Sequence, residues 1–272
     1  MNKKLNTRII RKHKLVNEQR ALQMLTCYDY QTAQLLNETI LDMILVGDSV
    51  GNVVLGYKTT IEVTLEEMII FSSAVKRGAP DKFVIADLPF GSYSTFEDGI
   101  NCATKLFKTS AVEAIKLEGA YPFQLQIIQR LVETGIPVMG HIGLTPQSVH
   151  ELGGYYTHGK DKNSADKLIQ EAKALEDAGC FAVVLECVEK KIAQQITENL
   201  NIPTIGIGSG TKTDGQVLVL NDLLKIGKDT PPSFCDPISN FYQLKKGAID
   251  SYLSAQILNL GLNKDEKLFI ND

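Results

Sequence analysis

Residues 83–89 read Phe-Val-Ile-Ala-Asp-Leu-Pro, a short apolar run that ends in a carboxylate. A continuous apolar run, without alternation, is typical of a parallel strand that is covered on both faces. Similar runs occur at residues 22–28, 43–46, 114–117, 138–139, 182–185, 204–207 and 217–220. Segments with helical periodicity lie between most of them, at residues 32–38, 64–76, 96–108, 123–133, 167–178 and 190–198. Eight strands that alternate with helices predict an α/β fold, a closed (β/α)8 TIM barrel.

The chain length and the absence of a low-complexity linker predict a single domain over residues 1–272. A barrel of this type needs about 250 residues, and we expect its core at about residues 20–222. Too few residues separate the last two predicted strands for a full helix, so that unit is abbreviated or the eighth strand is misplaced. From about residue 225 we expect a C-terminal extension that packs outside the barrel, with a helix near residues 247–258.

Charge and composition exclude several classes of protein. The chain has 28 basic and 32 acidic residues and a net charge of −4, which disfavours nucleic-acid binding because that affinity comes mostly from phosphate neutralisation. We expect no membrane segment, because no run of 18 apolar residues occurs, and no signal peptide. The five scattered cysteines form no C-x-x-C pair and are typical of free thiols in a reducing cytosol. We therefore expect a cytoplasmic protein.

Basic residues gather near the start of the chain, at Lys3, Lys4, Arg8, Arg11, Lys12 and Lys14. One interpretation is a solvated arm, and this is the one we expect. The other is a contact with an anion or with a neighbouring subunit.

Acidic side chains follow four of the predicted strands: Asp48, Asp87, Glu118 and Glu186. In a barrel, functional residues gather at the C-terminal ends of the strands. Lys116 precedes Glu118 by two positions, so both side chains point to the same face. Carboxylates about 4 Å apart repel by about 4 kcal/mol at an effective dielectric of about 20, so a proton or a cation must intervene. Oxygen ligands without clustered His or Cys favour a hard ion, by default Mg²⁺. The alternative is that each acid caps the following helix.

Other signals are weaker. His141 ends the fifth predicted strand and is either a structural or a catalytic histidine. His150 and His158 flank a Gly-rich loop, Gly153-Gly154-Tyr155-Tyr156, which is typical of a mobile lid or a subunit contact. The glycines at residues 206–210 could hold an anion, but they lack the remainder of a phosphate-binding motif, and we expect a tight turn.

Seven blocks in fixed order resemble the ketopantoate hydroxymethyltransferase family, folate-dependent enzymes of pantothenate synthesis. The blocks are residues 25–30, 46–49, 86–90, 116–119, 140–147 and 185–187, and finally 206–208 with 213–216. They cover about residues 20–222, and the tail beyond matches poorly. The sequence departs from the family pattern at Ala120 and Cys27, and neither is a position where the family has a charged residue.

This resemblance implies a (β/α)8 barrel and a divalent metal, usually Mg²⁺. It implies transfer of a one-carbon unit from 5,10-methylenetetrahydrofolate to 3-methyl-2-oxobutanoate, giving 2-dehydropantoate through a metal-stabilised enolate. The implied roles are metal binding by Asp48, Asp87 and Glu118, substrate contact by Asp48, Ser49, Asp87 and Lys116, and proton removal by Glu186. The family forms homo-oligomers, often large rings, so we expect one here, with a decamer as a candidate. The expected partners are small molecules, not nucleic acid or membrane.

Two other functions are open. The first is a metal-dependent lyase that acts on oxo acids, as in the phosphoenolpyruvate mutase and isocitrate lyase group, although a catalytic segment of the Lys-Lys-Cys-Gly-His type is missing from the sequence. The second is a non-catalytic sensor of an oxo acid. A degenerate enzyme usually loses a charged site residue, and none is missing at the expected positions.

Overall fold

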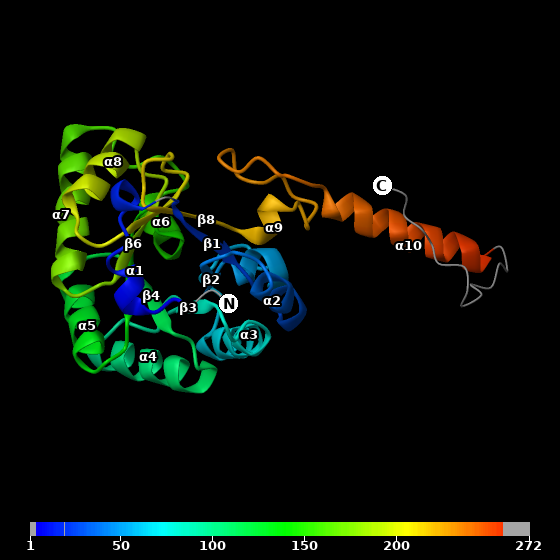
Figure 1. The fold of residues 1–272 in the computed structure, drawn as a ribbon, viewed down its shortest axis with the longest axis horizontal. Coiled ribbons are helices and arrows are strands. Elements are labelled where there is room, and N and C mark those ends of the chain that lie inside the picture. Colours follow the sequence, from blue (N-terminus) through cyan, green and yellow to red (C-terminus); the bar gives the residue numbers. More distant parts are fainter. Residues whose placement is uncertain (1–3, 19, 258–272) are drawn as a thin grey trace. The chain divides into compact units, whose positions relative to one another are not determined.

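The computed structural model describes residues 4–18 and 20–257. Within these residues, parallel strands pair in chain order from first to last and close into a barrel, as predicted (Figure 1). The strands are β1 (Leu22–Thr26), β2 (Met43–Val46), β3 (Phe83–Asp87), β4 (Ala114–Glu118), β5 (Val138–Gly143), β6 (Ala182–Glu186), β7 (Thr204–Ile207) and β8 (Gly215–Leu218). The chain divides into two compact units, one up to Leu220 and the other from Asn221.

Helices surround the barrel and cover the outer face of its strands (Figure 1). The longer ones are α2 (Tyr30–Asn37), α3 (Leu65–Gly78), α4 (Phe96–Ser110), α5 (Pro122–Glu133), α7 (Lys162–Asp177) and α8 (Lys190–Asn199). Their starts follow ordinary capping chemistry. Thr64 and Glu67 form a capping box at α3, and Thr95 and Asp161 accept backbone N–H groups at α4 and α7.

Inward-pointing side chains fill the barrel as a packed core rather than a pore. Phe83 and Phe181 meet edge to face with their ring centroids 5.6 Å apart. The buried cluster consists of Ile10, Leu22, Met24, Met43, Leu45, Phe83, Ile85, Ala114, Met139, Phe181, Ala182, Val184, Ile205, Ile207 and Val217. The apolar core therefore occupies the middle and the N-terminal end of the barrel, which leaves the C-terminal end for polar groups.

The eighth strand starts earlier than predicted. It runs over Gly215–Leu218 rather than 217–220, and it follows β7 without an intervening helix in the described chain. Gly215 and Gln216 pair with β1 and β7, but neither residue is apolar, so hydrophobicity could not reveal them. A Cβ at Gly215 would lie 2.5 Å from Ile205. Only glycine therefore fits at this crossing.

The expectation of a solvated N-terminal arm is wrong for part of that arm. The short helix α1 (Thr7–Ile10) places Ile10 fully buried in the barrel core. Lys14 donates to Asp214 Oδ2 at 2.6 Å, and the Leu15 N–H donates to Asp214 Oδ1 at 2.8 Å. Arg8, Arg11 and Lys12 are exposed as expected, and Lys3 lies outside the described residues. The arm therefore closes the N-terminal end of the barrel.

We expect Ile10→Ala to lower the free energy of unfolding by about 2–5 kcal/mol, because it removes a buried side chain and leaves a cavity. The neighbouring Ile9 is 40% exposed, so Ile9→Ala is the matched control, with an expected change within about 0.5 kcal/mol. Urea unfolding followed by circular dichroism measures both changes. Equal losses in the two variants would show that the arm does not anchor the barrel.

The second unit contains α10 (Phe241–Ile257), which begins six residues before the helix predicted at 247–258; residue 258 lies outside the described residues. Within this unit, the Ile238 N–H donates to Leu223 O at 2.9 Å and the Phe241 N–H donates to Leu224 O at 3.0 Å. Packing of the extension on the barrel stays a prediction.

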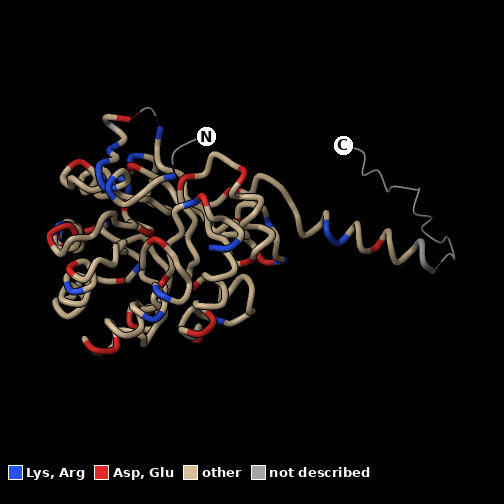
Figure 2. Tube along the Cα trace, turned by 60° about the horizontal axis from the view of Figure 1, so that its bottom comes forward, with Lys and Arg blue, Asp and Glu red and all other residues tan. Residues whose placement is uncertain are grey.

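The composition predicted free cysteines and no membrane segment. The five cysteines of the described chain are free thiols, and none of its helices combines the length and the hydrophobicity that a bilayer requires. Basic and acidic positions are interspersed over the barrel unit (Figure 2).

Candidate active site

All of the predicted site residues line one cavity at the C-terminal end of the barrel, with a volume of about 140 Å³. They are Asp48, Ser49, Asp87, Lys116, Glu118, His141 and Glu186. The prediction that Lys116 and Glu118 share the inner face is confirmed. The capping alternative is wrong for all four acids. The π-helical segment Gly51–Leu55 that follows β2 has Val50 as its N-cap, and α3 after it has Thr64. The helices that follow β3, β4 and β6 have Thr95, Tyr121 and Glu189 as their N-caps.

The strand register explains which side chains meet. Asp87 on β3 pairs with Lys116 on β4, and Glu118 pairs with His141 on β5. Gly143 on β5 pairs with Glu186 on β6, one step farther toward the mouth. Because adjacent parallel strands keep this register, acidic and basic side chains on adjacent strands lie side by side inside the barrel.

Asp48, Asp87 and Lys116 form the first of two charged groups. The Asp48 N–H donates to Asp87 Oδ2 at 3.1 Å, and Lys116 Nζ lies 3.1 Å from Asp87 Oδ1. Burial, together with the charges of Asp87 and Glu118, raises the pKa of Asp48 well above its usual range. Burial also raises the pKa of Asp87, although Lys116 opposes this. One ammonium does not neutralise this group, so a further positive charge or a proton is favoured.

Asp48 and Asp87 fit a hard divalent cation better than Glu118 does. Oδ1 of Asp87 is buried without a hydrogen-bond partner, 3.1 Å from the lysine. In the described chain, no three His, Cys, Asp or Glu side chains are arranged to hold an ion. Glu118 instead contacts His141 and accepts the Gln147 N–H at 3.1 Å. The three-carboxylate ligand set therefore stays a prediction, while two aspartates leave room for oxygen ligands from substrate or water.

His141 joins Glu118 to Glu186 in the second charged group. Its Nδ1 lies 3.3 Å from Glu118 Oε1, and its Nε2 lies 3.3 Å from Glu186 Oε2. Burial and Lys116 lower the pKa of His141, but the two carboxylates outweigh them and raise it to about 9. Lys116 Nζ is also 3.3 Å from Nδ1, and an ammonium accepts no hydrogen bond, so the Nδ1 proton faces Glu118. The two carboxylates therefore favour the protonated form of the imidazole.

Glu186 differs from the other acids in its access to solvent. Its side chain is 18% exposed, against 3% for Glu118 and 4% for Asp87. Glu186 lies on β6, which is across the barrel from β2 and β3, the strands before Asp48 and with Asp87. In the described structure, no contact links Glu186 to either aspartate. Glu186 is thus the carboxylate with the freest access to a molecule in the cavity.

Sequence reasoning assigned no role to Gln147, although the residue lies in one of the quoted blocks. Its Nε2 donates to Asp48 Oδ2 at 2.7 Å and to Leu88 O at 2.9 Å, and its Oε1 accepts from Tyr93. A single amide thus fixes the orientation of Asp48. Ser49, a predicted substrate contact, has its Oγ 2.7 Å from the Tyr28 hydroxyl, another partner that was not predicted. A single amide or phenol outside the strands and the longer helices has no sequence pattern that would have revealed it.

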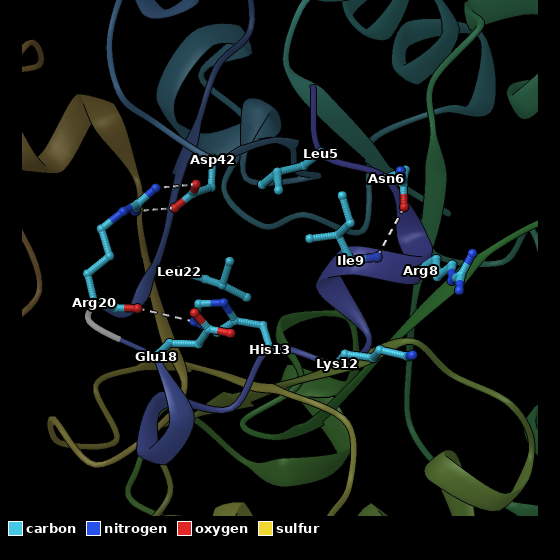
Figure 3. Close-up of a pocket in the computed structure, with 10 residues that line it drawn as sticks. All are labelled: Leu5, Asn6, Arg8, Ile9, Lys12, His13, Glu18, Arg20, Leu22 and Asp42. Atoms are coloured by element: carbon cyan, nitrogen blue, oxygen red, sulfur yellow. Dashed lines mark hydrogen bonds and ion pairs between the residues drawn. The ribbon is translucent and has the colours of Figure 1, made fainter. Parts of the chain in front are cut away.

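A larger cavity of about 910 Å³ lies at the opposite, N-terminal end of the barrel, next to the start of β1 (Figure 3). Arg20 binds Asp42 there through two hydrogen bonds of 2.6 and 2.7 Å, and His13 contacts Arg20 O at 3.2 Å. Residues at this end of a barrel serve stability, whereas chemistry is found at the C-terminal end. The smaller acidic cavity is therefore the candidate active site.

Fold and site together define a barrel enzyme with a buried, charged cavity at its catalytic end. The family model described as ketopantoate hydroxymethyltransferase matches residues 5–257, and the chain belongs to this family. Two relatives are named 3-methyl-2-oxobutanoate hydroxymethyltransferase. The protein of Leptospira interrogans serovar Lai is 48% identical over 85% of this chain and 88% of its own length. The protein of Thermotoga maritima is 48% identical over 89% of this chain and 90% of its own length.

Solved structures with a similar fold are far less similar in sequence. A 2,3-dimethylmalate lyase of the PEP mutase/isocitrate lyase superfamily has a TM-score of 0.59 and 16% identity, over 96% of this chain and 91% of its own. A phosphonopyruvate hydrolase in complex with oxalate and Mg²⁺ has a TM-score of 0.62 and 9% identity, over 96% and 90%. These likenesses show the barrel fold alone. The family match therefore favours the transferase over the lyase alternative.

Proposed function

We propose that the chain transfers the one-carbon unit of 5,10-methylenetetrahydrofolate to C3 of 3-methyl-2-oxobutanoate. With one water consumed, the products are 2-dehydropantoate and tetrahydrofolate, so a carbon–carbon bond replaces the C3–H bond. The observation that carries the proposal is a small cavity with a lysine and two aspartates on one side and a separate, accessible glutamate, Glu186, on the other. Relatives with 48% identity carry the name of this reaction.

The cavity suits a small anionic oxo acid. Its volume of about 140 Å³ is below the range of about 300–1,000 Å³ that drug-sized ligands occupy. Burial lowers the pKa of Lys116, but the charges of Asp87, Glu118 and Asp48 outweigh burial and raise it. The ammonium is therefore permanently charged, and it can stabilise the negative charge that develops on the keto oxygen as an enolate forms.

Asp48 and Asp87 are the residues that would hold a divalent cation, by default Mg²⁺. Bound there, such an ion supplies a Lewis acid for the keto oxygen of the substrate. The support is the fit described above: oxygen donors, a buried Asp87 Oδ1 that faces Lys116 at 3.1 Å, and an Asp48 pKa raised by burial and by neighbouring acids. Gln147 holds Asp48 through one oxygen only, which leaves the other oxygen available.

Glu186 acts as the general base in this proposal. It takes the C3 proton, and the electrons of the C3–H bond form the C2–C3 double bond of the enolate. His141, 3.3 Å away, holds the carboxylate in place. Water releases the one-carbon unit from the folate nitrogen as formaldehyde and leaves tetrahydrofolate. C3 of the enolate attacks the formaldehyde carbon, and the proton taken by Glu186 returns to the new alkoxide as the hydroxyl of 2-dehydropantoate. A base positioned in this way contributes about 10²- to 10⁴-fold to the rate.

Proton NMR of 3-methyl-2-oxobutanoate in deuterated water tests the first half of this reaction without folate. With protein and Mg²⁺ present, we expect the C3 proton signal to disappear as deuterium replaces hydrogen, because enolisation precedes transfer. A sample treated with a chelator is the control and keeps the signal. A persistent C3 signal in the complete sample, together with no formation of 2-dehydropantoate when the folate is added, would refute the proposed function.

We also propose that the protein works as a cytoplasmic homo-oligomer, on the basis of its family membership. Sedimentation velocity measures the size of the assembly directly. A single species with the mass of one chain, 30.0 kDa, would contradict this.

A further inference from the structure

The cavity cannot hold both substrates of the proposed reaction. At about 140 Å³ it has room for the oxo acid, whereas a folate, with two ring systems and a glutamate, needs at least the volume of a drug-sized ligand, about 300 Å³. The bulk of the donor must therefore lie outside, over the mouth, with its one-carbon unit directed inward. A residue that binds it should reach both the cavity and the solvent.

Tyr155 meets this condition. Among the described residues that line the cavity, it is the only phenylalanine, tyrosine or tryptophan. Its side chain is 63% exposed, and within the described chain no hydrogen bond holds its hydroxyl. It follows Gly153 and Gly154, whose φ angles of 74° and 137° are reached readily only by glycine. These two residues turn the chain after α6 (Val149–Leu152) and bring the ring to the mouth.

The charges around Tyr155 also place it beside the reacting groups. Burial raises the pKa of its phenol, and the negative charges of Glu186, Asp48 and Glu118 raise it further. The phenol therefore stays neutral and protonated. A neutral aromatic ring can stack on a flat ligand without placing a further negative charge next to the proposed base.

We propose that Tyr155 binds the folate donor by stacking against its planar pterin ring at the mouth of the cavity. This inference rests on the proposed function and names the side chain that takes the second substrate. A flat heteroaromatic ring gains dispersion and electrostatic attraction from an exposed phenol, as bases do on aromatic side chains. Tyr155 would then align the one-carbon unit with C3 of the oxo acid.

The next residue provides a matched control. Tyr156 is 49% exposed, but its ring already stacks on His158, with centroids 4.4 Å apart and an interplanar angle of 23°. It does not line the cavity in the described structure. Substitution at either position removes the same side chain from the same loop, and only one of the two should affect the donor.

The test measures tetrahydrofolate binding by calorimetry, with 3-methyl-2-oxobutanoate and Mg²⁺ present, and C3 proton exchange by NMR without folate. Tyr155→Ala should weaken tetrahydrofolate binding roughly 5- to 150-fold, the range that loss of one aromatic stack gives. It should leave C3 exchange within about twofold, because the oxo acid site is intact, and this also shows that the variant folds. Tyr155→Phe should bind like the unmutated protein, as should Tyr156→Ala.

Three results would overturn the inference: unchanged tetrahydrofolate affinity in Tyr155→Ala, an equal loss in Tyr156→Ala, or a loss of C3 exchange as large as the loss of binding. Unchanged affinity together with a smaller assembly in sedimentation would assign the ring to a subunit contact instead. Failure of the proposed function is a different outcome, because the unmutated protein would then neither exchange the C3 proton nor form 2-dehydropantoate.

Discussion

Glu186→Gln is expected to slow C3 proton exchange and overall turnover at least 100-fold. Glutamine keeps the shape of the side chain and its contact with His141, but it cannot accept a proton, and a general base contributes about 10²- to 10⁴-fold. Binding of 3-methyl-2-oxobutanoate should change less than about threefold, since Lys116 and the aspartates are untouched. Exchange is measured by NMR in deuterated water, and binding is measured by calorimetry.

Glu198→Gln is the matched control for this variant. Glu198 is exposed near the end of α8, and its side chain accepts a hydrogen bond from Gln194 at 2.8 Å, so exchange should not change. Full C3 exchange in Glu186→Gln would show that another group removes the proton. A comparable loss in affinity for the oxo acid would make Glu186 a binding residue and not the base.

Asp87→Asn is expected to reduce turnover at least 100-fold and to abolish the response to added divalent cation. The change keeps the side-chain volume, but it removes a negative charge that Lys116 contacts at 3.1 Å. Removing one preorganised electrostatic group typically costs about 10²- to 10³-fold. Paramagnetic Mn²⁺ gives a second measurement that is independent of activity, because its binding can be followed by electron paramagnetic resonance.

Asp166→Asn controls for the general loss of an acidic residue, since Asp166 is exposed on α7. It should bind Mn²⁺ like the unmutated protein. If Asp87→Asn kept normal Mn²⁺ affinity, the assignment of Asp87 as a metal ligand would be wrong. Full activity of the unmutated protein in the presence of a strong chelator would contradict the site model as a whole.

The barrel was predictable because strands covered on both faces are mostly apolar, and seven of them start where the apolar runs start. The eighth strand was predicted two residues too late. Gly215 and Gln216 belong to it because they pair with β1 and β7, and the hydrophobicity of the sequence does not show such pairing. Ile10 was missed for a related reason. Two isoleucines between arginines, Ile9 and Ile10, have no periodicity, and only the tertiary structure shows that Ile10 is the buried one.

Much of the candidate site was predictable from two local rules: acids at the ends of strands and the alternation of side chains, which paired Lys116 with Glu118. The relation between His141 and Glu186 was not, because it depends on the register of neighbouring strands. Gln147 lies in a short 3-10 helix, Pro146–Ser148, and Tyr155 lies in a loop; contacts made elsewhere set the path of the chain in both. Loop residues carry no period that a sequence alone would reveal.

Closure of the barrel has a consequence for biosynthesis. β8 pairs with β1, and the Leu220 N–H donates to Thr26 Oγ1 across 194 positions of the chain. During translation, one edge of β1 stays unpaired until β8 has left the ribosome. A nascent chain that stops before Gly215 keeps two open edges beside an apolar interior, the state that is most prone to aggregate or to require a chaperone.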